Sequence, residues 1–201
     1  TDFNRPERQA EITWVVRAVE LADHLGVKAT RIDAIMTGER DLPLDQRVER
    51  FASGVRQVIK QTANSSVGLG IENHGRQGND PAFLERLFDA VGSERLGRTL
   101  DSGNFYWAGH PLDRVYEIME RLAPRTKHTH LKNICFPPEK RQVERELGWK
   151  YGEYVSPIYE GDIDHFRVFK LLADAGYDGD LCIEDESVSY THLTLPTNRE
   201  V

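Results

Sequence analysis

Three carboxylates and one imidazole occupy matching places in the sequence, each at the end of a short apolar segment. They are Glu72 in GIENHG, Asp101 in TLDSGN, His130 in THLKN and Glu184 in CIEDE. Asp101 follows Glu72 by 29 residues, His130 follows Asp101 by 29, and Glu184 follows His130 by 54, close to two further intervals. This spacing indicates that each side chain holds the equivalent position in a repeating structural unit.

Acidic side chains that converge in this way repel one another unless a cation lies between them. Three oxygen ligands and one nitrogen ligand suit a single divalent ion. We favour Mn²⁺ for this site, with Mg²⁺, Co²⁺ and Zn²⁺ as alternatives.

Helix and strand patterns alternate along the chain and would position these residues. Apolar residues recur at helical spacing from Ile12 to Val19, and Asp80 before Pro81 predicts the N-cap and first residue of a later helix. We expect helices at residues 4–25, 44–58, 80–92, 110–123 and 160–179, and strands at residues 27–35, 65–73, 98–104, 126–134 and 180–184. The segment 135–159 interrupts the alternation and contains a charged piece that we expect to be helical.

Strands that alternate with helices of this length are typical of βα units around a parallel sheet. No glycine-rich phosphate loop follows a strand, which weakens a doubly wound nucleotide-binding fold. A complete (β/α)8 barrel needs about 250 residues, and this chain has 201. We therefore predict the α/β class and an incomplete (β/α)8 TIM barrel with about six of its eight units.

Side-chain alternation supports the barrel. If Glu72 points into the barrel, Leu69 and Ile71 face the surrounding helices, and if His130 points inward, so does Lys132. Polar side chains then gather at the interior end of the strands, where the catalytic rim of such a barrel lies.

Five segments carry a resemblance to a known family: IENHG, LDSGN, HTHLKN, EGDID and AGYDGDLCIEDE. In this order they resemble the successive strand-end motifs of the xylose isomerase-like TIM-barrel superfamily, specifically its sugar phosphate isomerase/epimerase branch. The similarity covers nearly the whole chain up to Glu186. It is specific for the superfamily and does not identify a substrate.

The resemblance implies a divalent-metal-dependent isomerase or epimerase of a sugar or sugar phosphate, which moves a proton α to a carbonyl through an enediolate. Its metal ligands would be Glu72, Asp101, His130 and Glu184. Glu72 and Glu184 would also be the catalytic acid/base pair, and we expect His74 and Lys132 to bind substrate. Asn133 replaces an aspartate that usually follows this lysine, and Asn104 stands where some epimerases carry a histidine.

Three alternatives stay open. An inosose-type dehydratase, a lyase, would use the same scaffold, metal and base. An abasic-site endonuclease-like hydrolase would need several zinc ions, more histidines and a basic groove, which a net charge of −7 and six histidines before residue 188 disfavour. A non-catalytic sugar-binding barrel is the third. Substrate identity, metal preference and oligomeric state are not decided by the sequence.

Several single residues have two interpretations. Asp101 precedes Ser102-Gly103-Asn104, so its side chain could cap a turn. Arg31 and Asp33 form either a structural ion pair or part of the rim. Asp164 is expected to cap the next helix. The aromatic residues of segment 135–159 form either a lid over the site or a packed surface loop.

Composition narrows the class of partners. The acidic balance and the lack of a basic run argue against nucleic acid, and no apolar run is long enough to cross a membrane. Cys135 and Cys182 lie far apart without metal-type or redox-type spacing, so we expect reduced thiols. We expect a cytoplasmic protein that acts on a small-molecule sugar or sugar phosphate, with a homo-oligomeric parent and a signal peptide both left open.

The final residues do not fit the rest of the chain. The segment VSYTHLTLPT, residues 188–197, corresponds to a translated transposon-end adapter of the kind used in sequencing libraries. We therefore predict a partial barrel at residues 1–187 and non-native sequence without function at residues 188–201. On this interpretation the chain is a fragment that lacks the first two βα units and the last helix. Its open sheet edges would make it poorly soluble and inactive, although its parent is an enzyme.

Overall fold

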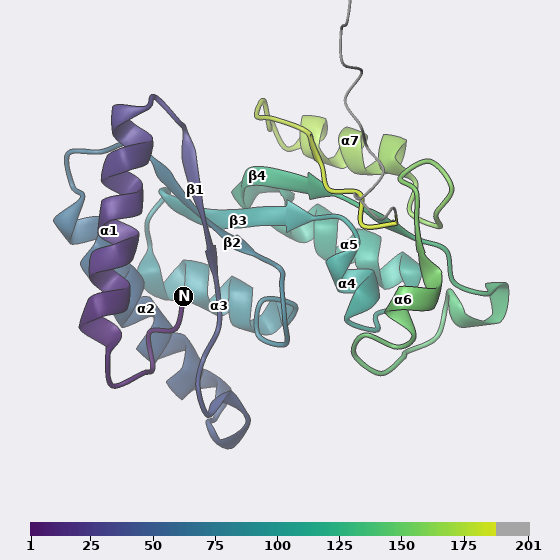
Figure 1. Ribbon diagram of the computed structural model, residues 1–201, viewed down its shortest axis with the longest axis horizontal. Helices are drawn as coiled ribbons and strands as arrows, with labels where there is room; N and C mark the ends of the chain where they lie inside the picture. The colour runs from purple at the N-terminus through teal and green to yellow at the C-terminus, as the bar shows by residue number, and fades with distance from the viewer. Residues whose placement is uncertain (188–201) are drawn as a thin grey trace, which may run out of the picture.

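Five parallel strands form one curved sheet in this computed structural model, which describes residues 1–187. Their order is β1 (Ala29–Asp33), β2 (Gly68–Glu72), β3 (Leu96–Asp101), β4 (Thr126–Leu131) and β7 (Cys182–Ile183). The main helices are α1 (Arg8–His24), α2 (Leu44–Gln61), α3 (Pro81–Val91), α5 (Leu112–Leu122) and α7 (His165–Asp174). Helices surround the strands in chain order, with α1 beside α2, α2 beside α3, and α5 beside α7 (Figure 1). The sheet is the wall of a partial TIM barrel, as predicted.

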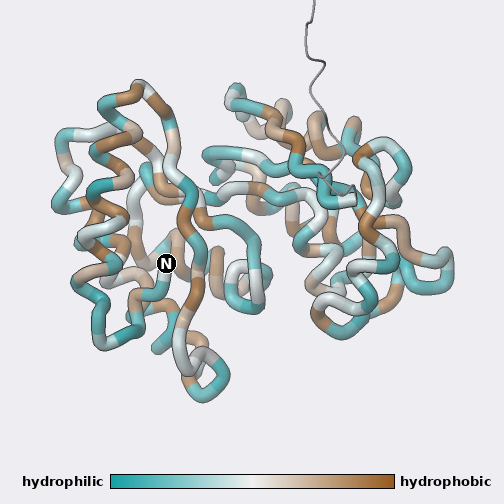
Figure 2. The backbone as a smooth tube through the Cα atoms, in the orientation of Figure 1, coloured by the Kyte–Doolittle hydropathy of each residue, from teal (hydrophilic) through white to brown (hydrophobic). Residues whose placement is uncertain are grey.

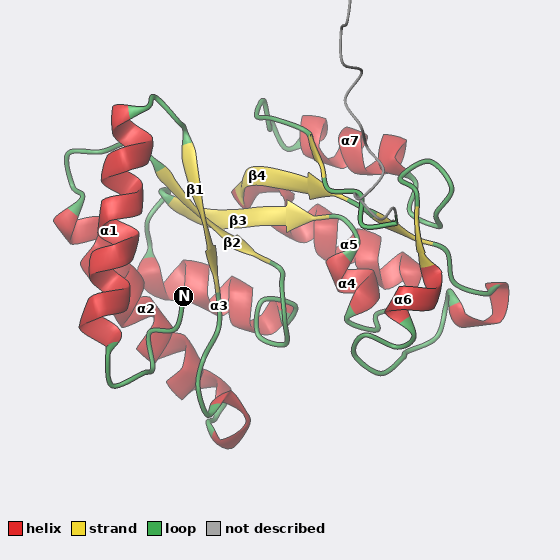
Figure 3. Cartoon of the chain, in the orientation of Figure 1, coloured by secondary structure: helices red, strands yellow, loops and turns green. Residues whose placement is uncertain are grey.

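Short elements complete the connections. They are the helices α4 (Asn104–Trp107) and α6 (Tyr151–Tyr154), the 3-10 turns η1 (Glu39–Asp41), η2 (Ala123–Arg125) and η3 (Pro138–Lys140), and the strands β5 (Asn133–Ile134) and β6 (Val155–Ser156). Figure 3 shows α4 beside α6, away from α1 and α2.

Local sequence explains where the helices begin and end. The Asp80 carboxylate accepts hydrogen bonds from the backbone N–H groups of Ala82 and Phe83, at 3.1 and 3.3 Å. The Asp164 carboxylate caps α7 in the same way, so both predicted N-caps are confirmed. Helix α3 ends at Gly92, whose φ of 63° is left-handed and suits glycine.

The hydrophobic core lies between the sheet and the helices. Leu69 and Ile71 of β2 are completely buried, as their predicted outward alternation requires. They join buried residues of the helices, such as Phe51, Leu87 and Ile118. Figure 2 shows apolar segments recurring along helices and strands, with hydrophilic segments in most of the connecting loops.

The connection that contains segment 135–159 differs from the expected count of βα units. His130 of β4 pairs directly with Cys182 of β7, so the 54-residue interval to Glu184 is one connection and does not contribute two units. The sheet of residues 1–187 therefore has five strands, and the estimate of about six units counted one too many. The inserted segment instead packs around its own aromatic cluster, with ring centroids of Phe136 and Tyr106 4.8 Å apart and Trp149 stacked on Tyr154. The small antiparallel pair β5–β6 holds it to the barrel.

Some boundaries also differ from expectation. Helix α1 begins at Arg8 rather than at residue 4, and β3 ends at Asp101, where the expected strand ran on to Asn104. Cys135 and Cys182 are unpaired, as expected. Within residues 1–187, no helix combines the length and apolar character needed to cross a membrane. The predicted adapter-derived segment, 188–201, lies outside the described residues.

Candidate metal centre

The four strand-end residues meet at one point. Glu72, Asp101, His130 and Glu184 each offer an atom that could bind a metal ion, and these atoms all lie within 4.8 Å of one another. Glu72 and Asp101 are buried, whereas the Glu184 side chain is 41% exposed. Their convergence follows from the parallel sheet, because each residue comes from the same end of a neighbouring strand. Their role as ligands stays a prediction.

Each carboxylate oxygen of Glu72 contacts a basic side chain. His130 Nδ1 donates to Glu72 Oε1 at 3.2 Å, and the Arg31 guanidinium forms an ion pair with Oε2. Burial alone would raise the pKa of Glu72, but the His130 hydrogen bond and the Arg31 charge outweigh it and lower that pKa. The same hydrogen bond raises the pKa of His130. The surroundings of Glu72 therefore favour its ionised form.

The contact between Arg31 and Glu72 resolves the open interpretation of Arg31. Arg31 bonds Asp33 at 3.1 Å and also reaches Glu72, so it is both an ion-pair partner and part of the rim. In the strand register Arg31 lies opposite Gly70, which has no side chain to obstruct the diagonal approach to Glu72. The glycine at position 70, two residues before Glu72, is the one feature of the sequence that could have suggested this contact.

Asp101 is fixed from two sides. The Asn73 side chain accepts from the Asp101 N–H at 2.8 Å and donates to its carbonyl at 2.9 Å, which ties two strand ends together. Asp101 Oδ1 accepts from the N–H groups of Gly103 and Asn104, both at 2.8 Å. One oxygen thus caps the turn, and the other, Oδ2, faces the cluster. The turn-capping interpretation of Asp101 is therefore confirmed, and its role as a metal ligand through the other oxygen stays a prediction.

Asp101 is also the carboxylate of the site whose ionised form is most disfavoured by its surroundings. Complete burial raises the pKa of Asp101 to about 7, with Glu72 adding to the rise and the nearby Lys132 ammonium opposing it. Because the carboxyl group is removed from water, a positive charge nearby is needed to keep it ionised.

Lys132 supplies positive charge to the cluster. Its Nζ lies 3.2 Å from Asp101 Oδ2, 3.4 Å from Glu184 Oε2 and 2.7 Å from Glu186 Oε1. Burial disfavours the ammonium, but Asp101 and the hydrogen bond to Glu186 outweigh it and raise the pKa of Lys132. Sequence reasoning did not single out Glu186 as a member of the site.

Carboxylate oxygens without hydrogen bonds indicate whether a cation would fit this cluster. Within residues 1–187, three buried carboxylate oxygens, Glu72 Oε2, Asp101 Oδ2 and Glu184 Oε2, accept no hydrogen bond. They lie instead beside the basic groups of Arg31, His130 and Lys132. Buried acceptors without hydrogen bonds are costly unless a cation approaches them. With the imidazole of His130 they form an oxygen-rich donor set that fits a divalent ion such as Mg²⁺, Mn²⁺ or Zn²⁺.

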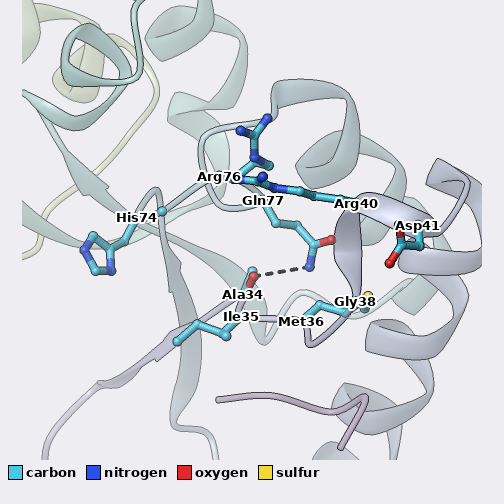
Figure 4. Close-up of a pocket in the computed structure, with 10 residues that line it drawn as sticks. Ala34, Ile35, Met36, Gly38, Arg40, Asp41, His74, Arg76 and Gln77 are labelled. Carbon is cyan, nitrogen blue, oxygen red and sulfur yellow. Dashed lines mark hydrogen bonds between the residues drawn. The ribbon is translucent and has the colours of Figure 1, made fainter. Parts of the chain in front are cut away.

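His74, the other predicted substrate contact, lies outside the cluster. Its exposed side chain lies 3.7 Å from Asp33 and lines a pocket of about 440 Å³ between the loops after β1 and β2 (Figure 4). Gln77 closes the floor of this pocket by donating to the carbonyl of Ala34 at 3.2 Å. A second cavity of about 570 Å³ reaches His128 and His130 on the inner face of the sheet. The role of His74 in substrate binding stays a prediction.

Comparison with known proteins identifies the family. The sequence profile described as "Xylose isomerase-like TIM barrel" matches residues 1–200, so the chain belongs to this family.

The curated relatives are named as enzymes. Inosose dehydratase of Klebsiella pneumoniae is 29% identical over 147 residues, covering 71% of this chain and 48% of the relative. Inosose dehydratase of Bacillus thuringiensis is 26% identical over 162 residues, covering 74% and 53%. The chain thus spans about half the length of the curated relatives it matches.

Solved structures share the fold at low sequence identity. A D-tagatose 3-epimerase-like protein has a TM-score of 0.66 at 19% identity, covering 91% of this chain and 65% of the other. The IOLI protein, with a bound zinc atom, has a TM-score of 0.66 at 17% identity and the same coverage. A Xylose isomerase-like TIM barrel protein of Mycobacterium smegmatis, in complex with magnesium, has a TM-score of 0.66 at 18% identity, covering 89% and 61%.

Proposed function

We propose that the protein containing this chain is a divalent-metal-dependent enzyme that removes a proton α to the carbonyl of a polyol ketone or sugar. The convergence of Glu72, Asp101, His130 and Glu184 is the observation that carries this proposal. A divalent cation held there would polarise the carbonyl and stabilise negative charge on its oxygen. The relatives named as inosose dehydratases support the same class of substrate.

Glu184 is the better placed of the two predicted acid/base residues. Its carboxylate is 41% exposed at the edge of the site, where a substrate can reach it. Glu72 is 3% exposed, and its oxygens are engaged by Arg31 and His130. Glu184 also lies near Lys132 and His130, but it is partly open to solvent, so we assign proton transfer to Glu184 and an electrostatic role to the enclosed Glu72.

This asymmetry favours dehydration over epimerisation. In a dehydration on one face, Glu184 takes the α proton, the C–H electron pair forms a C=C bond, and the β-hydroxyl leaves as water with the proton that Glu184 returns. Epimerisation instead requires a second group that protonates the opposite face of the carbon. Because Glu72 is poorly suited to that step, we propose a dehydratase acting on an inosose-like ketone.

Epimerisation is the second candidate. The observation that favours it is that two carboxylates, Glu72 and Glu184, converge on one point within 4.8 Å. Rotation of Arg31 away from Glu72 would release the second acid/base group. The isomerase or epimerase activity expected from the sequence therefore remains as this second candidate function.

Product analysis in deuterated water separates these activities. The full-length protein that contains this segment would be incubated with an inosose and a divalent metal. A product lighter than the substrate by one water supports dehydration, whereas a product that keeps this water and carries deuterium at the α-carbon supports epimerisation. Glu184→Gln should abolish either reaction, while substitution of the exposed Glu160, just after the inserted segment, by Gln should not. Unchanged turnover in Glu184→Gln would eliminate the assignment of this base.

A further inference from the structure

The inference concerns how Lys132 shares the cluster with a cation. The Lys132 ammonium lies 3.2 Å from Asp101 Oδ2 and 3.4 Å from Glu184 Oε2, and both carboxylates belong to the predicted ligand set. A divalent ion at the cluster carries the same sign of charge as Lys132. The two cations would therefore compete for the same carboxylates unless Lys132 has another partner.

Glu186 is that other partner. It accepts the hydrogen bond from Lys132 Nζ at 2.7 Å, the shortest of the three carboxylate contacts. Glu186 does not belong to the group of residues that could hold the metal. Its carboxylate therefore attracts the ammonium without occupying a ligand position.

Tyr151 fixes the position of Glu186. The Tyr151 hydroxyl donates to Glu186 Oε2 at 2.7 Å, while Glu186 Oε1 accepts from Lys132. Tyr151 belongs to α6 in the inserted segment 135–159, which is anchored to the barrel by the β5–β6 pair. One carboxylate oxygen of Glu186 thus contacts the inserted segment, and the other contacts Lys132 at the site.

We propose that Glu186 is a positioning residue for Lys132. It draws the ammonium to the side of the cluster, so that Asp101 and Glu184 stay available to a divalent cation. Tyr151 holds Glu186 in this position and links the inserted loop to the metal affinity of the site. This inference rests on the metal-binding part of the proposed function and adds residues that act through Lys132.

Cobalt titration of the full-length protein provides a test that does not depend on turnover, because bound Co²⁺ is followed by its visible absorbance. Glu186→Gln should raise the dissociation constant about tenfold, since Lys132 then rests on Asp101 and Glu184 alone. In the background of Lys132→Gln, the same substitution should change the constant by less than about twofold, because the competing ammonium is gone. This loss of effect in the double variant is the signature of positioning.

Two further variants serve as controls. Asp185→Asn removes the same charge from the adjacent residue, whose carboxylate accepts hydrogen bonds from the N–H and hydroxyl of Ser187. It should change the cobalt affinity much less than Glu186→Gln. Tyr151→Phe, which removes one hydrogen bond to Glu186, should weaken cobalt binding in the same direction by a smaller factor. It also keeps the test usable if Glu186→Gln does not fold.

Each outcome decides one of the claims. Equal effects of Glu186→Gln with and without the Lys132 side chain would show a simple loss of nearby negative charge and overturn the positioning role. The same conclusion follows if Asp185→Asn weakens binding as much as Glu186→Gln, or if Tyr151→Phe leaves the affinity unchanged. A wild-type protein that binds no cobalt would overturn the metal site itself, together with this inference.

Discussion

The most direct prediction concerns Asp101→Asn. The amide oxygen can still cap the turn by accepting from the N–H groups of Gly103 and Asn104, which Asp101 Oδ1 does at 2.8 Å. The amide NH₂ then replaces Oδ2, the oxygen that faces the cluster and the Lys132 ammonium. The substitution therefore keeps the local fold and removes one charged ligand from the predicted metal site.

The expected size of the effect follows from linkage between binding and folding. An ion at 100 times its dissociation constant stabilises the native protein by about 2.7 kcal/mol, which raises Tm by roughly 5–10 °C for a protein of 150–250 residues. If Asp101→Asn weakens binding a hundredfold, the same concentration stabilises by only about 0.4 kcal/mol. The shift in Tm should then fall to roughly 1–2 °C.

Thermal unfolding of the full-length protein with and without Mn²⁺ measures this shift. Asp80→Ala is the matched control, because it removes an N-cap that is not among the candidate ligands and should cost about 1 kcal/mol. It should lower Tm without the ion and keep the full ion-induced rise. A full rise in Asp101→Asn would refute the assignment of the cluster, and a lost rise in Asp80→Ala would show that the assay reports general stability.

Three other predictions follow from the same region. Because burial raises the pKa of Asp101 to about 7 in the folded state, its contribution to stability is full at low pH and is lost as pH rises through that value. In urea titrations without metal, the wild type should therefore lose stability relative to Asp101→Asn between about pH 4 and 7, with little further change above pH 7; a constant difference would contradict the perturbed pKa. Asn73→Ala removes both buried hydrogen bonds to the Asp101 backbone and should cost about 2–3 kcal/mol by urea unfolding, and a cost below about 0.5 kcal/mol would mean that Asn73 does not hold the strand ends. Gly70→Ala places a Cβ 2.5 Å from the Thr99 hydroxyl, so it should destabilise the fold by about 1–3 kcal/mol, and a variant as stable as wild type would show that Thr99 rotates away freely.

Much of the fold could be predicted because local and long-range signals agree. The caps at Asp80 and Asp164 lie where the side chains suggest, and the strand alternation around Leu69 and Ile71 identifies the buried face of β2. Segment 135–159 could not be predicted in the same way. Its structure depends on aromatic contacts between Phe136 and residues distant in sequence, which leave no periodic pattern.

The convergence of the site was also predictable, because the carboxyl ends of neighbouring parallel strands meet at one end of a barrel. The partners of each side chain were not. Arg31 reaches Glu72 because Gly70 leaves space beside it, and Glu186 meets Tyr151 because of the path of the inserted loop. Such contacts depend on three-dimensional neighbours that spacing alone does not specify.

The short strand β7 has a consequence for how the centre would exchange its ion. Glu72 and Asp101 are the last residues of strands of five and six residues, whereas Glu184 follows a strand of two residues that pairs only with β4 among the described strands. Three of the four candidate ligands are thus set in place by the sheet, and the fourth is attached more loosely at its margin. An ion that enters from solvent would therefore meet Glu184 first, because its side chain is 41% exposed whereas Glu72 and Asp101 are buried.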